Sequence, residues 1–309
     1  MSDTFFTAAP HWTWFIIPYF FVGGLAGGAY FLAAILEWFG RPEDRPAIRT
    51  GYYVAVVGAI VSGALLTFDL GRPLRFWHML FQSENFPHLM FKSWSPISFG
   101  AWGLLLFGLF SALSALGAMS EEGRVRAPAA QALRGGTGLA RLVAAAGGLF
   151  AFFLAGYTGV LLSVTNRPIW ADSPWLGALF LVSGGSTGAA TLLLLAPRRG
   201  IAQTSIRWLS SFDRNALVLE LVILVAFLVS LGSVARVWVS GWGLLLLVGV
   251  VGAGIVWPLR LHAGGAGGAS AMASSAKLVL VGGFLLRVVT LLASEGIALH
   301  RVAAAGGAQ

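Results

Sequence analysis

The sequence predicts an all-α integral membrane protein with eight transmembrane helices, on the evidence of its composition, its hydropathy and the length of its apolar runs. Apolar residues make up 57% of the 309 residues and charged residues only 10%, and the mean hydropathy is strongly positive. Soluble domains carry about 25% charged residues, which cover their wet surface. A protein this poor in charge therefore needs lipid as the solvent of its surface.

Eight apolar segments are long enough to cross a bilayer, because a hydrocarbon core of about 30 Å takes roughly 20 helical residues. Glycine, which occurs 41 times, is common in membrane helices, where small residues let two backbones approach closely. We therefore interpret residues 1–309 as a single membrane domain. The segments run approximately over residues 14–38, 51–70, 94–119, 139–164, 175–196, 215–237, 241–259 and 277–298.

Three of these segments have boundaries that need comment. The first follows MSDTFFTAAPHW, which lacks the basic start of a cleavable signal peptide, so we interpret it as a span of the mature protein. The sixth and seventh are separated by a tight junction around Arg236 and Gly241, which leaves an odd count open. Before the eighth, the Gly-rich stretch 262–275 is interpreted as a flexible loop.

Lysine and arginine in the connecting loops predict the orientation, because basic loops stay cytoplasmic. The loops after the odd-numbered segments hold thirteen of these residues and the other face holds six. We therefore expect a multi-pass protein of the bacterial inner membrane with both termini on the periplasmic, outer side. In this context the net charge of +8 indicates topology, and nucleic acid binding is a remote alternative. The thirteen are Arg41, Arg45, Arg49, Arg124, Arg126, Arg134, Arg141, Arg198, Arg199, Arg207, Arg214, Arg260 and Lys277; the six are Arg72, Arg75, Lys92, Arg167, Arg236 and Arg301.

The residue inventory limits the redox groups that this protein can hold. It has no cysteine, which excludes disulfides, iron-sulfur clusters and thiolate metal sites. A haem b would usually need two histidines within the spans, whereas the five histidines fall at or outside the predicted span ends, so we expect no haem. If the protein takes part in electron transfer, the redox groups must be a lipid-soluble quinone and centres on another subunit. The histidines are His11, His78, His88, His262 and His300.

Polar residues at membrane depth gather near the predicted outer face. Tyr19 and Asp69 lie at the outer ends of the first and second segments, and Tyr157 lies about two turns inside the outer end of the fourth. A quinone site needs a donor to each carbonyl, a proton relay to water and apolar walls. These three residues could supply the donors and relay of such a pocket. The same face also carries His11, Thr13, Arg72, Arg75, His78, Asn166 and Arg167.

Each of these residues also has a structural interpretation. A tyrosine near the interface is often an aromatic-belt anchor, which applies to Tyr19. Asp69 could close a turn as an interfacial ion pair with nearby arginines. Glu220 and Arg287, in the sixth and eighth segments, are interpreted as a pair across helices, although an ionisable group in a span is a functional hypothesis by default. Glu37, at an inner helix end, is expected to be solvated.

Four motifs in the first half resemble the NrfD/PsrC family, the membrane subunits of polysulfide-reductase-like complexes. They are HWTWFIIPYFFVGGLAGGAYFLA (11–33), FDLGRPLRFWHMLF (68–81), FKSWSPISFGAWGLLLFG (91–108) and AGYTGVLLSVTNRPIW (155–170). They occur in the family's order, and the second half matches only in hydropathy. The resemblance implies a cofactor-free anchor of two four-helix bundles, with a pocket for menaquinone or ubiquinone near the outer face.

The resemblance also implies roles for single residues. The family's pocket tyrosine falls on Tyr157, and its acidic residue at the end of the second span falls on Asp69. In the first span, Tyr19 stands where some members place a quinone-contacting histidine, and Ile16 stands where they place an asparagine. Tyrosine does not titrate near neutral pH as histidine does, so the proton relay could use His11 or Asp69 instead.

Partners follow from the resemblance in the same way. It implies a ferredoxin-like subunit with four [4Fe-4S] clusters, in many members linked to a molybdopterin catalytic subunit. We expect docking on the outer face, with the loops 72–92 and 166–174 as candidate contacts. Basic loops could equally bind lipid headgroups.

Two other functions stay open at this stage. A secondary transporter for a small anion could use Asp69, Glu220 and Arg287 as its path, and it predicts inverted repeats with broken helices at the midplane. A structural anchor could bind no quinone, or could move protons through Asp69 and Glu220 toward the cytoplasm.

Overall fold

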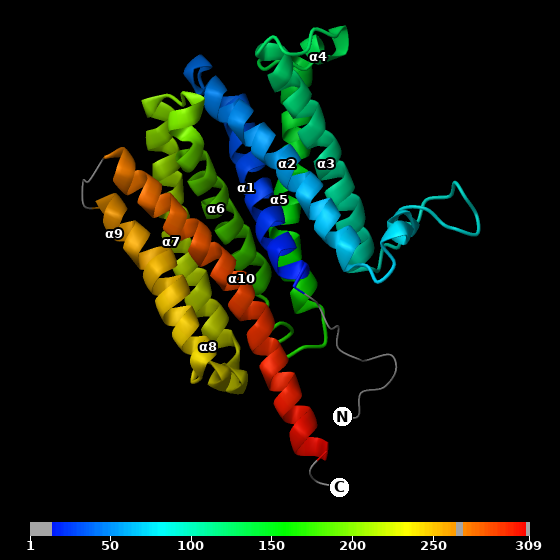
Figure 1. Cartoon of the computed structure of the whole chain (residues 1–309), viewed down its shortest axis with the longest axis vertical. Coiled ribbons are helices and arrows are strands. Elements are labelled where there is room, and N and C mark those ends of the chain that lie inside the picture. Colours follow the sequence, from blue (N-terminus) through cyan, green and yellow to red (C-terminus); the bar gives the residue numbers. More distant parts are fainter. Residues whose placement is uncertain (1–13, 264–267, 307–309) are drawn as a thin grey trace.

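The computed structural model describes residues 14–263 and 268–306, and regular secondary structure in these ranges is helical apart from one antiparallel bridge between Phe81 and Leu89. Figure 1 shows long helices that run up and down through the molecule. The long helices are α1 (Ile16–Phe39), α2 (Arg45–Asp69), α3 (Pro96–Glu121), α5 (Gly138–Ser163), α6 (Leu176–Arg199), α7 (Gln203–Ser230) and α10 (Ala269–Gly306). The shorter elements are η1 (Pro42–Asp44), η2 (Pro73–Met79), α4 (Pro128–Ala132), η3 (Gly232–Trp238), α8 (Gly241–Leu244), the π-helical η4 (Leu245–Val256) and α9 (Trp257–Ala263).

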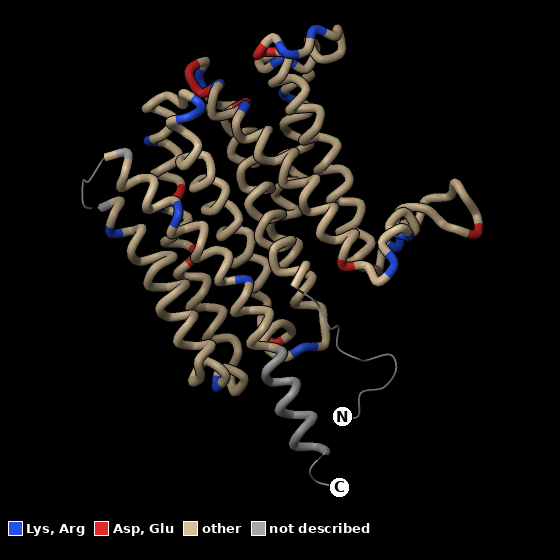
Figure 2. The backbone as a smooth tube through the Cα atoms, in the orientation of Figure 1, with Lys and Arg blue, Asp and Glu red and all other residues tan. Residues whose placement is uncertain are grey.

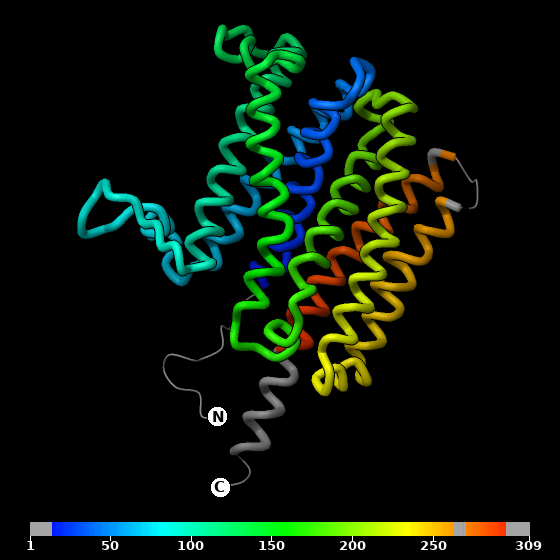
Figure 3. The backbone as a smooth tube through the Cα atoms, turned by 180° about the vertical axis from the view of Figure 1, so that it is seen from behind, coloured from blue at the N-terminus to red at the C-terminus, as the bar shows by residue number. Residues whose placement is uncertain are grey.

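The helices form two bundles that share a long contact. The first bundle contains α1, α2, α3 and α5, and the second contains α6, α7, α10 and the rod made of α8, η4 and α9. Seen from behind, α5 and α6 run side by side where the bundles meet (Figure 3). The sequence therefore predicted the fold class and the bundle arrangement correctly.

Helix α1 is the central element of the molecule. It packs against α2 and α5 in its own bundle and against α6 and α10 in the other. In its most apolar window 72% of the residues are buried, against 28% for the window in α2. Helix α1 is thus surrounded by protein, and its glycines let neighbouring backbones approach closely.

Glycines let the backbones of α1 and α6 touch. The Cα atom of Gly24 lies 3.3 Å from the position that a Cβ atom would take at Gly184, and a Cβ atom at Gly28 would collide with the backbone oxygen of Gly184. No residue other than glycine fits this crossing without moving a helix. The two bundles are thus joined backbone to backbone.

Seven helices are long and apolar enough to span a membrane within the described ranges, and the number becomes eight if α7 and its continuation η3 count as one bent span. Helix α7 contains four charged residues, and η3 leaves it at an angle of 115°. The predicted sixth segment, 215–237, therefore included a bend that the helix does not continue through, and α7 begins twelve residues earlier, at Gln203.

Two other helices begin earlier than the sequence predicted. Helix α2 begins at Arg45 and not near residue 51, because its charged first turns are helical although they lie outside the apolar run. Helix α10 begins at Ala269, so the second part of the predicted loop 262–275 is helix and not loop. Alanine and serine at 269–275 are compatible with a helix, and composition alone pointed to flexibility.

The loops expected to be basic lie together. The connections from α1 to α2, from α3 to α5 and from α6 to α7 gather at one end, with the end of α9 and the beginning of α10; this is the upper end in Figure 1, and we call it the basic end. The beginning of α1 lies at the opposite end. In Figure 2, blue and red segments concentrate toward the two ends, with a few inside the second bundle.

Candidate functional site

Tyr157 lies inside the first bundle, fixed against the beginning of α3. It belongs to α5, and the residue is 7% exposed. The hydroxyl donates a hydrogen bond of 2.8 Å to the carbonyl of Pro96, and the ring stacks on Phe153 with centroids 5.2 Å apart. A Cβ atom at Gly100 would collide with the ring, so that glycine makes the space for the phenol. The one proton that Tyr157 can donate is thus used within the protein.

Tyr19 lies on α1, which packs against α5, the helix of Tyr157. It is 2% exposed. Ile16, about one turn farther from the basic end, is also buried. The two predicted tyrosines are therefore both buried on neighbouring helices, whereas an aromatic-belt anchor faces lipid headgroups.

Two buried hydroxyl groups beside these tyrosines were not singled out from the sequence. Ser62 of α2 is fully buried. The position that a Cβ atom would take at Gly23 lies 3.6 Å from the Ser62 oxygen and 3.7 Å from the Tyr19 ring, so both side chains border Gly23. Thr158 follows Tyr157 on α5 and is fully buried as well. Neither hydroxyl has a hydrogen-bond partner within the described residues. Buried polar groups normally have one, so these two are available to a ligand or to water.

The predicted outer residues are divided among several places. Asp69 is the last residue of α2 and is partly exposed, next to the contact between Phe68 and Phe15 that joins the ends of α2 and α1. Arg72 and Asn166 are exposed in the loops after α2 and α5. His11 and Thr13 lie outside the described residues.

Arg167 and His78 interact locally. Arg167 is buried, and its guanidinium lies 5.2 Å from the ring centroid of Trp170. The Trp170 indole donates to the carbonyl of Thr290 in α10, so this loop is attached to the second bundle. His78 stacks on Trp77 in η2. Of the predicted site residues that the structure describes, only Tyr19, Ile16 and Tyr157 are deep inside the first bundle.

A second group of polar residues is buried between α6, α7 and α10. Arg287 is fully buried and donates to the Ser183 hydroxyl at 2.6 Å and to the carbonyl of Phe180 at 3.2 Å. Its guanidinium also lies 3.3 Å from the Cβ position of Gly24 on α1. Glu220 of α7 is also buried, at 4% exposure. Within the described residues no salt bridge joins it to Arg287, so the expected pair is not a direct ion pair.

Asp213 extends this group toward the basic end. It lies two turns before Glu220 on α7, so both face the same side of the helix. Its carboxylate accepts a 2.7 Å hydrogen bond from Ser186 and lies 3.7 Å from Nε2 of His262 in α9. Asp213 was not predicted as a functional residue because it lies before the predicted sixth segment. Its spacing of seven residues from Glu220 was the signal that could have identified it.

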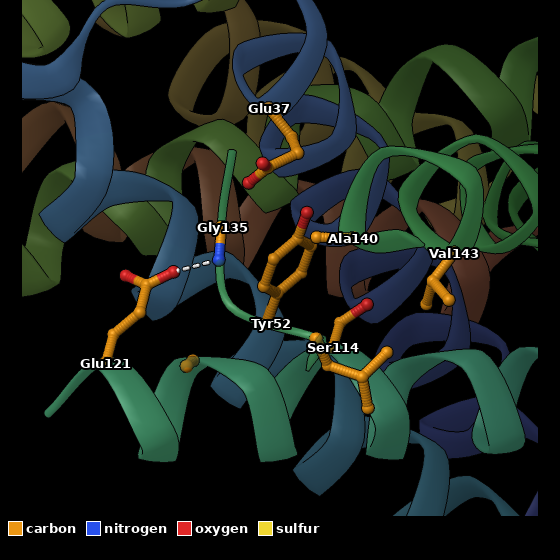
Figure 4. A pocket seen from close by; sticks show the side chains of 9 residues that line it. Glu37, Tyr52, Ser114, Glu121, Gly135, Ala140 and Val143 are labelled. Carbon is orange, nitrogen blue, oxygen red and sulfur yellow. Dashed lines mark hydrogen bonds between the residues drawn. The ribbon is translucent and has the colours of Figure 1, made fainter. Parts of the chain in front are cut away.

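A third polar cluster, shown in Figure 4, lies at the basic end of the first bundle. Glu37 is 3% exposed, which contradicts the expectation that it is solvated. Arg45 donates to both of its carboxylate oxygens, at 2.7 and 3.1 Å, and the backbone N–H of Gly136 donates at 2.8 Å. One donor comes from the beginning of the next helix and the other from the loop before α5, and together they pair with the carboxylate. Tyr52 and Glu121 line the small cavity beside it.

The amino-acid sequence is similar to one protein family and to three known proteins. A family model described as "Polysulphide reductase, NrfD" matches residues 4–298. The C subunit of the polysulfide reductase of Wolinella succinogenes is 27% identical over 269 residues, which cover 81% of this protein and 82% of that one. Protein NrfD of Escherichia coli is 28% identical over 318 aligned residues, covering 92% and 95%. A protein NrfD homolog of Haemophilus influenzae is 29% identical over 274 residues, covering 80% and 82%.

Proposed function

The chain belongs to the NrfD family of polysulphide reductase membrane subunits, and from that premise we propose that it binds a quinone in the first bundle and exchanges electrons between the quinone pool and an iron-sulfur partner. The observation that carries the proposal is that two buried phenols, Tyr19 and Tyr157, lie on the packed helices α1 and α5, and that the Ser62 hydroxyl beside Tyr19 has no partner among the described residues. Such a group of donors within apolar walls suits a ligand with two carbonyl oxygens. Because the family consists of anchor subunits of reductase-type complexes, we do not propose the anion-transporter alternative.

The donors in the pocket fit a quinone headgroup, which would supply reversible two-electron, two-proton chemistry at its oxygens. Tyr157 can turn its hydroxyl from Pro96 toward such an oxygen at modest cost, because the Pro96 carbonyl, in the first turn of α3, is positioned for the helical bond from Gly100. Tyr19 and Ser62 can hold the other side. Their burial keeps water away from the donors, which strengthens each hydrogen bond.

Asp69 has the position of a proton relay. It ends α2 at the opposite end of the bundle and is partly exposed, so its carboxylate has access to water there. A carboxylate at a pocket entrance can pass protons between the pocket and the bulk. The partner would dock at this end, and we propose a ferredoxin-like subunit with four [4Fe-4S] clusters and a molybdopterin catalytic subunit beyond it. The loops after α2 and α5, which carry Arg72 and Asn166, are the candidate contacts.

Replacing Tyr157 by Phe tests the proposal. We expect the purified complex to lose most of its quinol-linked turnover and the protein to bind a quinone about five-fold less tightly, since one hydrogen bond is worth about 1 kcal/mol. Assembly stays intact because the ring still packs on Phe153 and Gly100. The measurements are quinone titration of the purified protein and quinol-driven reduction of the partner's clusters. Tyr53→Phe, at the basic end of α2, is the matched control, and unchanged quinone affinity in the Tyr157 variant would remove this phenol from the site.

A second function, proton movement from the basic end, is favoured by the buried line of ionisable residues in the second bundle. It runs from His262 through Asp213 and Glu220 to Arg287, which touches α1 at Gly24. Burying three ionisable groups at membrane depth is costly, and such groups are functional candidates by default. This line lies within the second bundle, whereas the path expected from the sequence ran through Asp69 and Glu220.

Asp213→Asn separates this function from quinone binding. The amide can still accept the hydrogen bond from Ser186 but cannot carry a proton, so we expect proton uptake from the basic end to fall to the background while quinone affinity is unchanged. The measurement is pH change per electron transferred by the complex in vesicles. Glu43→Gln, an exposed acid at the basic end, is the control. Normal proton uptake by the Asp213 variant would exclude this path.

A further inference from the structure

A groove lies on the outside of the second bundle, away from the proposed quinone site in the first bundle. It has a volume of about 500 Å³, which is within the range of small-molecule pockets. The rod of α8, η4 and α9 forms one wall, and Leu278 of α10 forms part of the other. The residues that line the rod side are Leu247, Val248, Gly252, Ala253, Val256, Trp257 and Arg260.

The groove runs along the π-helical stretch η4 and continues onto α9. Lining residues recur every four to five positions, at 247–248, 252–253, 256–257 and 260, so they form one stripe along the rod. Gly252 and Ala253, in the middle of the stripe, have the smallest side chains and leave the hollow. From Leu247 to Arg260 the stripe covers roughly 15–20 Å at helical rise. That length matches one leaflet of a hydrocarbon core of about 30 Å.

The charge of the groove is confined to its basic end. Arg260 lines that end and is exposed, and Lys277, also exposed, directly precedes the lining residue Leu278. Within the described residues neither cation takes part in an ion pair. Trp257, 56% exposed, lies one turn from Arg260 in the position of an interfacial anchor. The rest of the groove is apolar, so its chemistry changes from apolar to cationic along its length.

We propose that this groove binds an anionic phospholipid, with an acyl chain along Leu247–Val256 and the phosphate headgroup between Arg260 and Lys277. An acyl chain matches the apolar stripe in length and character, and a negatively charged headgroup complements two cations that have no ion-pair partner among the described residues. Basic pockets between membrane helices on the cytoplasmic side bind anionic headgroups in this way. The inference goes beyond the proposed quinone function and does not depend on it.

The charge contribution predicts a measurable preference. Each lysine or arginine near a headgroup contributes about a five-fold gain in affinity for an anionic lipid. Two cations therefore predict that phosphatidylglycerol binds roughly thirty-fold more tightly than phosphatidylcholine with the same acyl chains. The uncharged part of the groove contributes equally to both lipids.

Native mass spectrometry of the purified, delipidated full-length protein tests this, with titration of each lipid. We expect Arg260→Gln to reduce the preference for phosphatidylglycerol about five-fold and Arg260→Gln with Lys277→Gln to abolish it. Ala253→Trp, which fills the hollow, should weaken both lipids alike. Arg134→Gln, an exposed arginine at the basic end of the first bundle, is the matched control and should change nothing.

The same titrations contain the outcomes that would overturn the proposal. Equal binding of the two lipids, or a preference that survives in the double variant, would show that the two cations do not select a headgroup. Displacement of phosphatidylglycerol by inorganic phosphate alone would identify a free-anion site. A dimer that disappears on Ala253→Trp would identify a second copy of the protein as the occupant.

Discussion

Gly28→Leu is expected to separate the two bundles and to lower the free energy of unfolding by more than about 3 kcal/mol. Even a Cβ atom at this position would collide with the backbone oxygen of Gly184 on α6, and a leucine adds three further carbons. A side chain could rotate away from such a collision but a backbone oxygen cannot, so α1 or α6 has to move as a whole. The measurement is the thermal unfolding midpoint of the purified protein in detergent, together with the yield of monodisperse protein.

Gly63→Leu is the matched control for this substitution. Gly63 lies on α2, and a Cβ atom there would meet nothing within 4 Å. Leucine has a higher helix propensity than glycine, so this variant should be as stable as the parent protein or slightly more stable. If Gly28→Leu unfolded at the same temperature as Gly63→Leu, the close crossing of α1 and α6 would not support the fold.

Arg287→Met should also destabilise the protein strongly, by about 3–5 kcal/mol, because it leaves the buried Glu220 without a nearby positive charge and removes the donor to Ser183 and Phe180. Methionine keeps most of the apolar volume of the arginine side chain, so packing against Phe180 and Gly24 changes little. The cost comes from an acidic group that has lost its countercharge at membrane depth. Chemical unfolding in mixed micelles measures it.

The double variant Glu220→Gln with Arg287→Met distinguishes charge from packing. When both partners of a buried pair become uncharged, most of the lost stability should return. Arg124→Met is the control, because Arg124 pairs with Glu122 at 2.9 Å on the surface, where an ion pair is worth about 0–1 kcal/mol. A double variant as unstable as Arg287→Met would mean that shape, and not the buried charge, causes the loss.

Hydropathy predicted the fold because the bilayer sets a minimum length for an apolar helix, and each long span of this protein exceeds that length. Hydropathy failed to predict the helix ends where helices continue past the apolar region. The first turns of α2 contain Arg45 and Arg49, and the first turns of α7 are polar and contain Arg207. The beginnings of both helices were therefore assigned to loops. Helix ends of this kind are stabilised by tertiary contacts, which a single-sequence pattern does not contain.

The candidate site was predictable in part for a similar reason. Tyr157 and Tyr19 were identified because each combines a polar group with an apolar span. Ser62 and Thr158 were overlooked because serine and threonine are common in membrane helices, and only the fold shows that their hydroxyls have no partner among the described residues. Glu37 was judged by its place near a helix end, whereas Arg45 and the backbone of Gly136 bury and satisfy it.

The central place of α1 also affects how the protein is made. Along the sequence, α1 is separated from its neighbour α6 by the rest of the first bundle, and α10 follows later still. During synthesis the glycines of α1 that touch Gly184 therefore stay without their partner until α6 has entered the membrane. The contact between Gly24 and Arg287 forms after that, so the second bundle closes onto α1 in stages.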